Sequence, residues 1–196
     1  MDILNVVNSI KIFLIYIMTL SRNKYNTKSR NYKRSHKKLL KGGHPKIING
    51  IQLVPRTVFP VNFDFRGHDL AGVNLSYCIL HSANFEGVNL ERATFIGAIL
   101  NEASFVSANL SNANLQNAHL NDADLTGSTL TSAIFSNADL SDVYLIGANL
   151  KRASLFRAIL NGADLSGADL SGADLKGADI NNITFDQFTN TRGIFR

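Results

Sequence analysis

Four carboxylates recur at intervals of five in the segment NGADLSGADLSGADLKGADI (161–180), namely Asp164, Asp169, Asp174 and Asp179. Two carboxylates within reach of one substrate can act as general acid and general base, and the glycine two residues before each of them could belong to a phosphate-binding loop. Either chemistry requires the fold to gather these residues at one place. The position of each carboxylate therefore depends on how a five-residue repeat folds.

A period of five does not suit ordinary secondary structure. On an α-helix, five steps advance a side chain by about 500°, so Leu165, Leu170 and Leu175 would spiral around the axis. In a flat strand, an odd period would send every second leucine to the opposite face. A short extended piece with Ala163 and Leu165 on the same side, followed by a corner, lets each unit repeat the same arrangement. We therefore predict a coil of short extended segments joined by turns.

The pattern runs without insertion over residues 61–185. The last residue of each unit is Leu, Ile or Phe in all 25 units, and the residue two places earlier is alanine in 17 of them. We expect these two positions to point inward and fill a narrow core, and the other three, mostly Asp, Asn, Ser, Thr and Gly, to point outward. Terminal units of repeat arrays are commonly atypical. The exceptions to alanine gather in the first coil, at Phe63, His68, Val73 and Cys78.

The units NADLS, GANLK and GADLS resemble the pentapeptide-repeat family, whose signature is A(D/N)LXX. The resemblance implies an all-β fold, a right-handed quadrilateral parallel β-helix with one unit per face and four units per coil. The array would then form about six coils and a rod roughly 30 Å long at a strand spacing of ~4.8 Å. A step of 20 would stack Phe65, Phe85 and Phe105, and would also stack Ile79 on Ile99.

A four-sided coil separates the carboxylates that suggested catalysis. Asp164, Asp169, Asp174 and Asp179 would lie one on each face, too dispersed to share a substrate, and would support corners. The glycines of the same units would supply permissive backbone angles at turns and would not form a phosphate loop. We predict no enzyme activity, no catalytic residue and no cofactor.

Cysteine and histidine offer little for a metal site. Cys78 is the only cysteine, so the chain contains neither an internal disulfide nor a cysteine cluster. Cys78 and His68 occupy positions that alanine usually fills, where Cys78 is expected to pack as a small apolar group. His81 and His119 would point outward on one face, two coils apart. We therefore predict no metal site.

The N-terminal part differs in charge from the repeat. Residues 1–60 carry 12 Lys and Arg against one acid, whereas residues 61–196 carry 8 against 14. The basic character belongs to the tail, so direct nucleic-acid binding by the rod is not expected. We predict five segments. They are an apolar segment (1–20), a basic, partly disordered linker (21–47), a lead-in and N-terminal cap (48–60), the repeat (61–185) and a C-terminal cap (186–196).

Residues 3–20 are apolar but interrupted by polar side chains. They could be a membrane anchor, an interfacial amphipathic helix or targeting segment, or a short element that packs on the domain. The basic run over 21–46 could contact anionic lipid or nucleic acid, or be a solvated linker. If the segment inserts, the positive-inside rule keeps the rod cytoplasmic, so we expect a cytoplasmic location or the cytoplasmic face of a membrane.

One face of the predicted rod carries acids and neither Lys nor Arg. We call these five residues the acidic stripe: Glu102, Asp122, Asp139, Asp142 and Asp179. The basic residues gather elsewhere, on the opposite face and the wall beside it. We hypothesise that the stripe binds a protein partner of a non-enzymatic interaction scaffold, which the tail could tether to a membrane. Ordinary variation of a solvated surface is the alternative.

The resemblance also implies a second function, because quinolone-resistance pentapeptide proteins resemble duplex DNA in shape and charge and bind type II topoisomerases. Duplex DNA carries one charge per ~1.7 Å, so a mimic roughly 30 Å long would need about 18 negative charges. Residues 61–185 offer 13 acids and 6 bases, a net charge of −7 spread over four walls. The charge count favours the scaffold over the DNA mimic.

Overall fold

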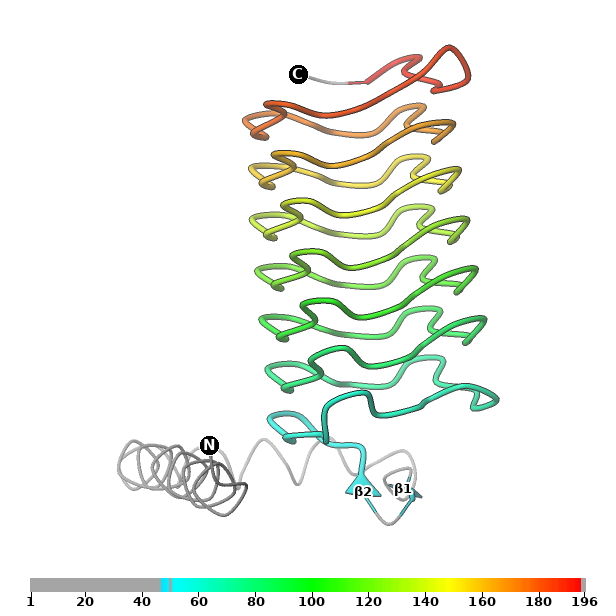
Figure 1. Ribbon diagram of the computed structural model, residues 1–196, viewed down its shortest axis with the longest axis vertical. Helices are drawn as coiled ribbons and strands as arrows, with labels where there is room; N and C mark the ends of the chain where they lie inside the picture. The colour runs from blue at the N-terminus through cyan, green and yellow to red at the C-terminus, as the bar shows by residue number, and fades with distance from the viewer. Residues whose placement is uncertain (1–46, 50, 195–196) are drawn as a thin grey trace, which may run out of the picture. The chain divides into compact units, whose positions relative to one another are not determined.

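A computed structural model describes residues 47–49 and 51–194 of the chain. Two short strands, β1 (Ile47–Ile48) and β2 (Ile51–Gln52), pair antiparallel with Ile48 opposite Ile51. Beyond β2 the chain winds into a stack of coils, which Figure 1 shows from the cyan to the red end of the colour scale. Each five-residue unit of the repeat contains a two-residue turn and one bridging residue.

Parallel bridges join residues that are 20 positions apart, so four units complete one coil. One column of bridged residues consists of Asp64, Asn84, Ser104, Asp124, Tyr144, Asp164 and Thr184. Three further columns are built in the same way. Backbone hydrogen bonds connect neighbouring coils on both sides of each bridge, as where the Ser104 N–H donates to the Ala83 carbonyl at 2.9 Å. The predicted step of 20 and the four-unit coil are confirmed.

A tight turn at the start of each unit makes the corner. In the unit 101–105, the Ala103 N–H donates to the Leu100 carbonyl at 3.0 Å, and Glu102 has a φ of 60°. A positive φ at the third residue of a four-residue turn is the requirement of a type II turn, and it favours Gly, Asn and Asp. Those residue types recur at this second position of the units, so the outward residues follow the geometry of the corner.

The carboxylates that suggested catalysis hold the corners. The Ser166 N–H donates to Asp164 Oδ1 at 2.9 Å, and the Lys176 N–H donates to Asp174 Oδ1 at 3.0 Å. Such local hydrogen bonds satisfy backbone donors that the turn leaves without a partner. The four aspartates lie in four different bridged columns. The prediction that they support corners, one on each face, is confirmed.

The core contains the two inward positions of each unit. The central residues from Phe65 to Leu175 and most of the alanines are buried. Phe85 stacks between two other rings, with centroid distances of 4.4 Å to Phe65 and 4.8 Å to Phe105. Cys78 is fully buried among the apolar side chains. The predicted core, the phenylalanine stack and the packing role of Cys78 are confirmed.

Two positions predicted to point inward are exposed. His68 is exposed in the first coil, although alanine occupies the equivalent buried position in most units. Phe185 was expected to be a central core residue, but 64% of its surface is exposed. A central side chain is covered by the coils on both sides of it, and Phe185 lies in the last unit of the repeat. The inward rule therefore holds up to Leu175, after which Ile180 is only half-buried.

The turn-and-bridge pattern continues beyond both ends of the sequence repeat. Val58 bridges Ile79 and Asp169 bridges Asn190, each across 21 residues. One extra residue at each junction shifts the phase of the repeat by one. The unbroken period of five in the sequence therefore ends at residues 61 and 185, although the coil continues past both. Within the N-terminal extension, Leu53 is buried in the same core.

The tail predictions lie outside the described residues. These are the apolar segment over 3–20 and the basic run over 21–46, and membrane contact through either one stays a prediction. Among residues 47–49 and 51–194, the structure has no helix with the length and apolar character needed to span a bilayer.

Valine at Gly97 should destabilise the protein more than valine at Gly87. Both glycines have positive φ values, 61° and 66°, where a β-branched residue is strained by about 1–2 kcal/mol. A Cβ at Gly97 would lie 2.7 Å from the Tyr77 ring, whereas one at Gly87 would meet nothing within 4 Å. Thermal unfolding of the two variants measures the difference, and equal melting temperatures would contradict a role for the ring contact.

Candidate functional site

Three carboxylates of the acidic stripe occupy one corner of the rod. Glu102, Asp122 and Asp142 are second-position residues of consecutive coils, with φ values of 60°, 59° and 56°. We call them the corner carboxylates. Coils are ~4.8 Å apart, so three negative side chains follow one another along the rod. Among the described residues none of the three forms an ion pair, and the Ser82 hydroxyl donates to Glu102 Oε2 at 3.1 Å.

The other two stripe residues hold corners of the fold. The Ser141 N–H and hydroxyl donate to Asp139 Oδ1 at 3.2 and 2.7 Å, and the Asn181 N–H donates to Asp179 Oδ1 at 3.1 Å. Burial raises the pKa of Asp139, but the hydrogen bonds from Ser141 and the Asn121 side chain outweigh it and hold the pKa below its usual value. The stability that Asp139 adds is therefore present at neutral pH and is lost as the pH falls through the lowered pKa.

Uncharged polar residues separate the corner carboxylates from the middle of the wall. The Asn101 side-chain N–H donates to Asn121 Oδ1 at 3.3 Å, and His81 Nδ1 lies 2.9 Å from the Asn101 carbonyl. His81 is thus held against the next coil. His119 lies exposed in the bridged column beside these residues. Histidine contributes to the surface of this wall, as predicted, and the two histidines have separate neighbours.

Three isoleucines lie along the middle of the same wall, with His119 and Asp139 between the second and the third, and the sequence pattern did not predict them as a candidate surface. Ile79, Ile99 and Ile159 belong to the bridged column that also contains Asp139 and Asp179. Ile99 is 38% exposed and Ile159 is 42% exposed. We call these three residues the isoleucine column. The signal was available in the sequence, because this fourth position of the unit carries Asp or Asn in the repeat signature.

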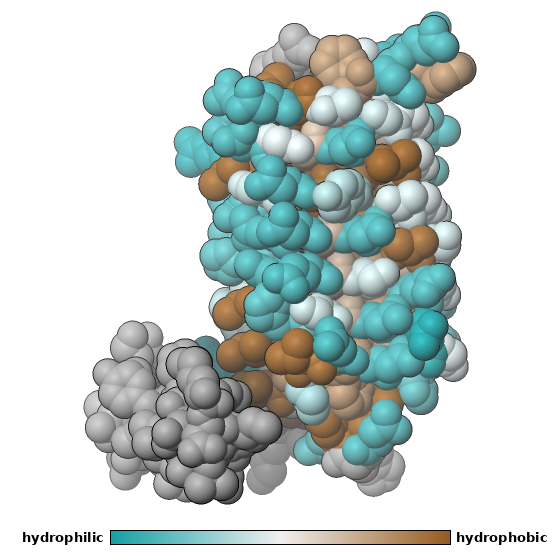
Figure 2. Space-filling model, in the orientation of Figure 1, coloured by the Kyte–Doolittle hydropathy of each residue, from teal (hydrophilic) through white to brown (hydrophobic). Residues whose placement is uncertain are grey.

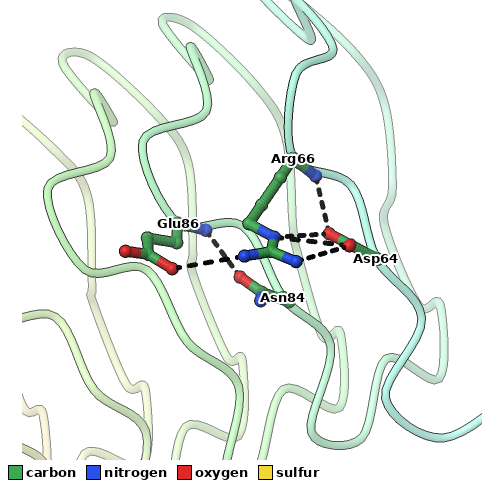
Figure 3. A network of polar contacts seen from close by, with 4 residues as sticks. All are labelled: Asp64, Arg66, Asn84 and Glu86. Carbon is green, nitrogen blue, oxygen red and sulfur yellow. Dashed lines mark hydrogen bonds and ion pairs between the residues drawn. The ribbon is translucent and has the colours of Figure 1, made fainter.

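The remaining charges are largely neutralised locally near the N-terminal end of the rod. Arg66 lies between two carboxylates, donating to Asp64 Oδ2 at 3.0 Å and approaching Glu86 Oε2 at 3.8 Å (Figure 3). The hydrogen bond from the Arg66 side chain lowers the pKa of Asp64. Arg92 pairs with Glu91 at 3.4 Å. These exposed pairs contrast with the corner carboxylates.

The basic residues nearer the C-terminal end lie on other walls. Lys151 pairs with Asp169 at 3.2 Å, and the Arg157 guanidinium lies 5.0 Å from the centre of the Phe156 ring. Among the described residues, the bridged column with Asp139 and the two corner columns that follow it carry neither Lys nor Arg, whereas Arg157 lies in the corner column that precedes it.

Within residues 47–49 and 51–194, no group of three His, Cys, Asp or Glu side chains is arranged to hold a metal ion. The side of the rod in Figure 2 is mostly hydrophilic, with separate apolar side chains between the polar ones. Rows of side chains on a rigid wall can contact an extended partner and set its register.

Comparisons with known proteins identify repeats over the same residues. A family model described as a pentapeptide repeat region matches residues 78–155, and a second, described as pentapeptide repeats (8 copies), matches residues 62–92 and 148–187. No curated protein sequence matches the chain significantly.

Several solved structures are similar to the chain. HetL, a pentapeptide repeat protein involved in heterocyst differentiation regulation in Nostoc, is 24% identical over 72% of this chain and 85% of its own, with a TM-score of 0.49. Rfr23 from Cyanothece is 29% identical over 61% and 88%, with a TM-score of 0.43. QnrB1, a plasmid-mediated fluoroquinolone resistance protein, is 21% identical over 71% and 82%, with a TM-score of 0.24.

Proposed function

Because the chain belongs to the pentapeptide-repeat family, we propose that its right-handed, four-sided β-helix is a non-enzymatic scaffold whose acidic stripe binds a protein partner. The observation that carries the proposal is the row of corner carboxylates, Glu102, Asp122 and Asp142, in consecutive coils. The corner angle favours Asp at this position, but Gly and Asn fit it equally well, and like charges opposite one another destabilise a sheet. A basic surface on a partner would offset the repulsion.

The rest of the wall supports the same function. Asp139 and Asp179 add negative charge while holding corners, and the described columns of the wall contain no cation that would neutralise them. Charged side chains on a rigid wall steer a partner of opposite charge and fix its register. Lys151 and Arg152 lie on other walls, whereas Arg157 lies at the corner that precedes this wall.

DNA mimicry receives less support from the distribution of charge. The acids of residues 61–185 are divided among four walls, and several are hydrogen-bonded at corners or paired with Arg66 or Lys151. A mimic of duplex DNA needs a dense and continuous row of negative charge along its length. Inhibition of gyrase supercoiling by the isolated repeat would favour mimicry over the scaffold.

Neutralising the corner carboxylates should weaken partner binding. The variant combines Glu102→Gln, Asp122→Asn and Asp142→Asn. We expect affinity for a basic partner recovered with the full-length chain to fall about tenfold, because each exposed ion pair contributes roughly 0.2–1 kcal/mol. The dependence of affinity on salt should become shallower. Titration by calorimetry at several salt concentrations measures both quantities.

The matched control removes the same number of charges from other walls. It combines Glu86→Gln, Glu91→Gln and Asp174→Asn. The control should bind the partner with the affinity and salt dependence of the wild-type chain. If the variant with all three corner carboxylates neutralised binds the partner as tightly as the wild-type chain, the acidic stripe is an ordinary solvated surface. The scaffold proposal would then lose its support.

A further inference from the structure

Tyr144 stands at a position where the repeat signature places Asp or Asn. Asp124 and Asp164, its neighbours in the bridged column, each accept a hydrogen bond at 2.9 Å from the backbone N–H two residues later. The tyrosine ring cannot accept the equivalent bond at its own corner. Tyrosine is favoured in strands, but 49% of the surface of Tyr144 is exposed, so packing accounts for only part of the side chain. The exposed part of the ring can contact another molecule.

Three carboxylates surround this ring. The bridges place Asp124 and Asp164 beside Tyr144 in the coils on either side. Asp142, one of the corner carboxylates, lies two residues earlier at the corner of the same unit. Ile146, which is 40% exposed, follows at the next corner. We call these five residues the Tyr144 site, because the aromatic ring lies at its centre. The site presents apolar surface framed by negative charge.

The wall that carries the Tyr144 site consists of the units that begin at residues 81, 101, 121, 141 and 161. These units contain Glu102 and Asp122 in addition to the three carboxylates of the site. Over this span, neither the units nor the two corner residues after each of them include Lys or Arg. Arg66 lies at the N-terminal end of the wall and pairs with Asp64 at 3.0 Å. The wall is therefore complementary in charge to a basic partner.

Arginine matches the chemistry of the Tyr144 site better than lysine does. Its stem can lie along apolar surface, while its planar guanidinium stacks on aromatic rings and donates to two carboxylate oxygens at once. A carboxylate accepts about four hydrogen bonds, so Asp124 and Asp164 keep acceptors beyond those used at their corners.

The chain already contains a contact between an arginine and a tyrosine. The Arg56 guanidinium lies 5.5 Å from the centre of the Tyr77 ring. In the part of the chain that the structure describes, no Lys or Arg lies over the Tyr144 ring in this way. A partner would therefore have to supply the cation for Tyr144.

We infer that the Tyr144 site binds an arginine side chain of the protein partner. The guanidinium stacks on the exposed face of the Tyr144 ring and donates to Asp142 and to a neighbouring carboxylate of the bridged column. The stem of the arginine packs on Ile146. Asp142 also belongs to the corner carboxylates, so the inference rests on the proposed function and names the side chain that the partner supplies.

Three matched peptides test the choice of arginine with the full chain. The probe is a peptide of about ten residues that alternates Arg with Ser, and the comparison peptides carry Lys or citrulline in place of Arg. Citrulline keeps the shape of arginine and removes its charge. We expect the Arg peptide to bind at least about threefold more tightly than the Lys peptide and about tenfold more tightly than the citrulline peptide. Equal binding of the Arg and Lys peptides, measured by fluorescence anisotropy, would overturn the assignment of arginine.

Substitutions of the ring test the place of binding. Tyr144→Leu should weaken binding of the Arg peptide about fivefold and leave its salt dependence unchanged, because the variant removes an uncharged aromatic ring. Tyr144→Phe keeps the ring and should bind as the wild-type chain does, and an equal loss in this variant would contradict stacking on the ring face. The matched control, Tyr77→Leu, removes an exposed tyrosine from another corner and should also bind normally.

A second variant without the ring separates a loss of binding from a loss of structure. Tyr144→Asn restores the signature residue, whose side chain can accept the corner hydrogen bond from the Ile146 N–H. We expect its melting temperature to be no lower than that of the wild-type chain. It should bind the Arg peptide as weakly as Tyr144→Leu does.

The combined results distinguish this inference from the proposed function. If Tyr144→Leu and Tyr144→Asn both bind the Arg peptide as the wild-type chain does, the arginine inference fails, and a loss of partner binding on neutralising the corner carboxylates would still support the scaffold. If neutralising the corner carboxylates leaves binding to the natural partner unchanged, the scaffold proposal fails. A fivefold loss in both variants without the ring, together with normal binding by Tyr144→Phe and Tyr77→Leu, supports the inference.

Discussion

Replacing Leu115 with aspartate should open the coils around residue 115. Leu115 is fully buried in the middle of the rod, where its backbone N–H donates to the Ile134 carbonyl in the next coil. Removal of a buried leucine side chain alone costs about 2–5 kcal/mol, and a buried carboxylate without a partner adds to this, so we expect a total above about 5 kcal/mol. That is comparable to the whole stability of many domains.

Hydrogen exchange measures this effect locally. In a repeat protein each coil is stabilised by its neighbours, so the loss of protection should be greatest in the coils that contact residue 115 and smaller at a distance. The matched control is Asn117→Asp, which adds the same charge two residues away at an exposed corner with a φ of 57°. The control should keep its protection. Similar exchange in the two variants would contradict the assignment of inward and outward positions.

Native Cys78 should react with a thiol-alkylating reagent at least about 100-fold more slowly than the unfolded chain at pH 8. The side chain is fully buried, and its thiol donates to the Val54 carbonyl at 3.3 Å. Burial raises the pKa of Cys78 to about 11, which leaves very little reactive thiolate in the folded state. Alkylation kinetics with and without denaturant give the ratio.

The raised pKa also predicts a dependence of stability on pH. The folded pKa of Cys78 lies above that of an unfolded cysteine, so the neutral thiol stabilises the fold at lower pH. This stability is lost as the pH rises from the unfolded pKa toward 11. Rapid alkylation of the native protein would contradict both expectations, because it would require frequent opening of the contact with Val54.

In the proposed docking surface, some acidic residues stabilise the fold and others are free to vary. Asp139 and Asp179 belong to the acidic stripe, yet they form the corner hydrogen bonds that the signature residue forms elsewhere. Glu102, Asp122 and Asp142 stand at second positions, where Gly, Asn and Ser also occur and the backbone angle is the same. The three corner residues can therefore vary with the partner without loss of the fold.

Several structural details could not be predicted from the period alone. The one-residue shifts beside Val58 and Asn190 break the count of five, and only the bridges reveal that the coil continues past them. Phe185 is exposed because no further coil covers it among the described residues. The repeat pattern predicts which side chains point inward but not whether a neighbouring coil covers them.

The amino-acid pattern was enough to predict the repeat, the core positions and the uneven distribution of charge. A strict period of five allows only one set of positions to face inward, because the same turn and extended segment recur in every unit, so Leu110 and Leu150 had to be buried. Which outward residues become neighbours depends on how the chain coils. Residues 20 apart become neighbours only when the coil closes after four units, and this closure places Glu102, Asp122 and Asp142 in one row.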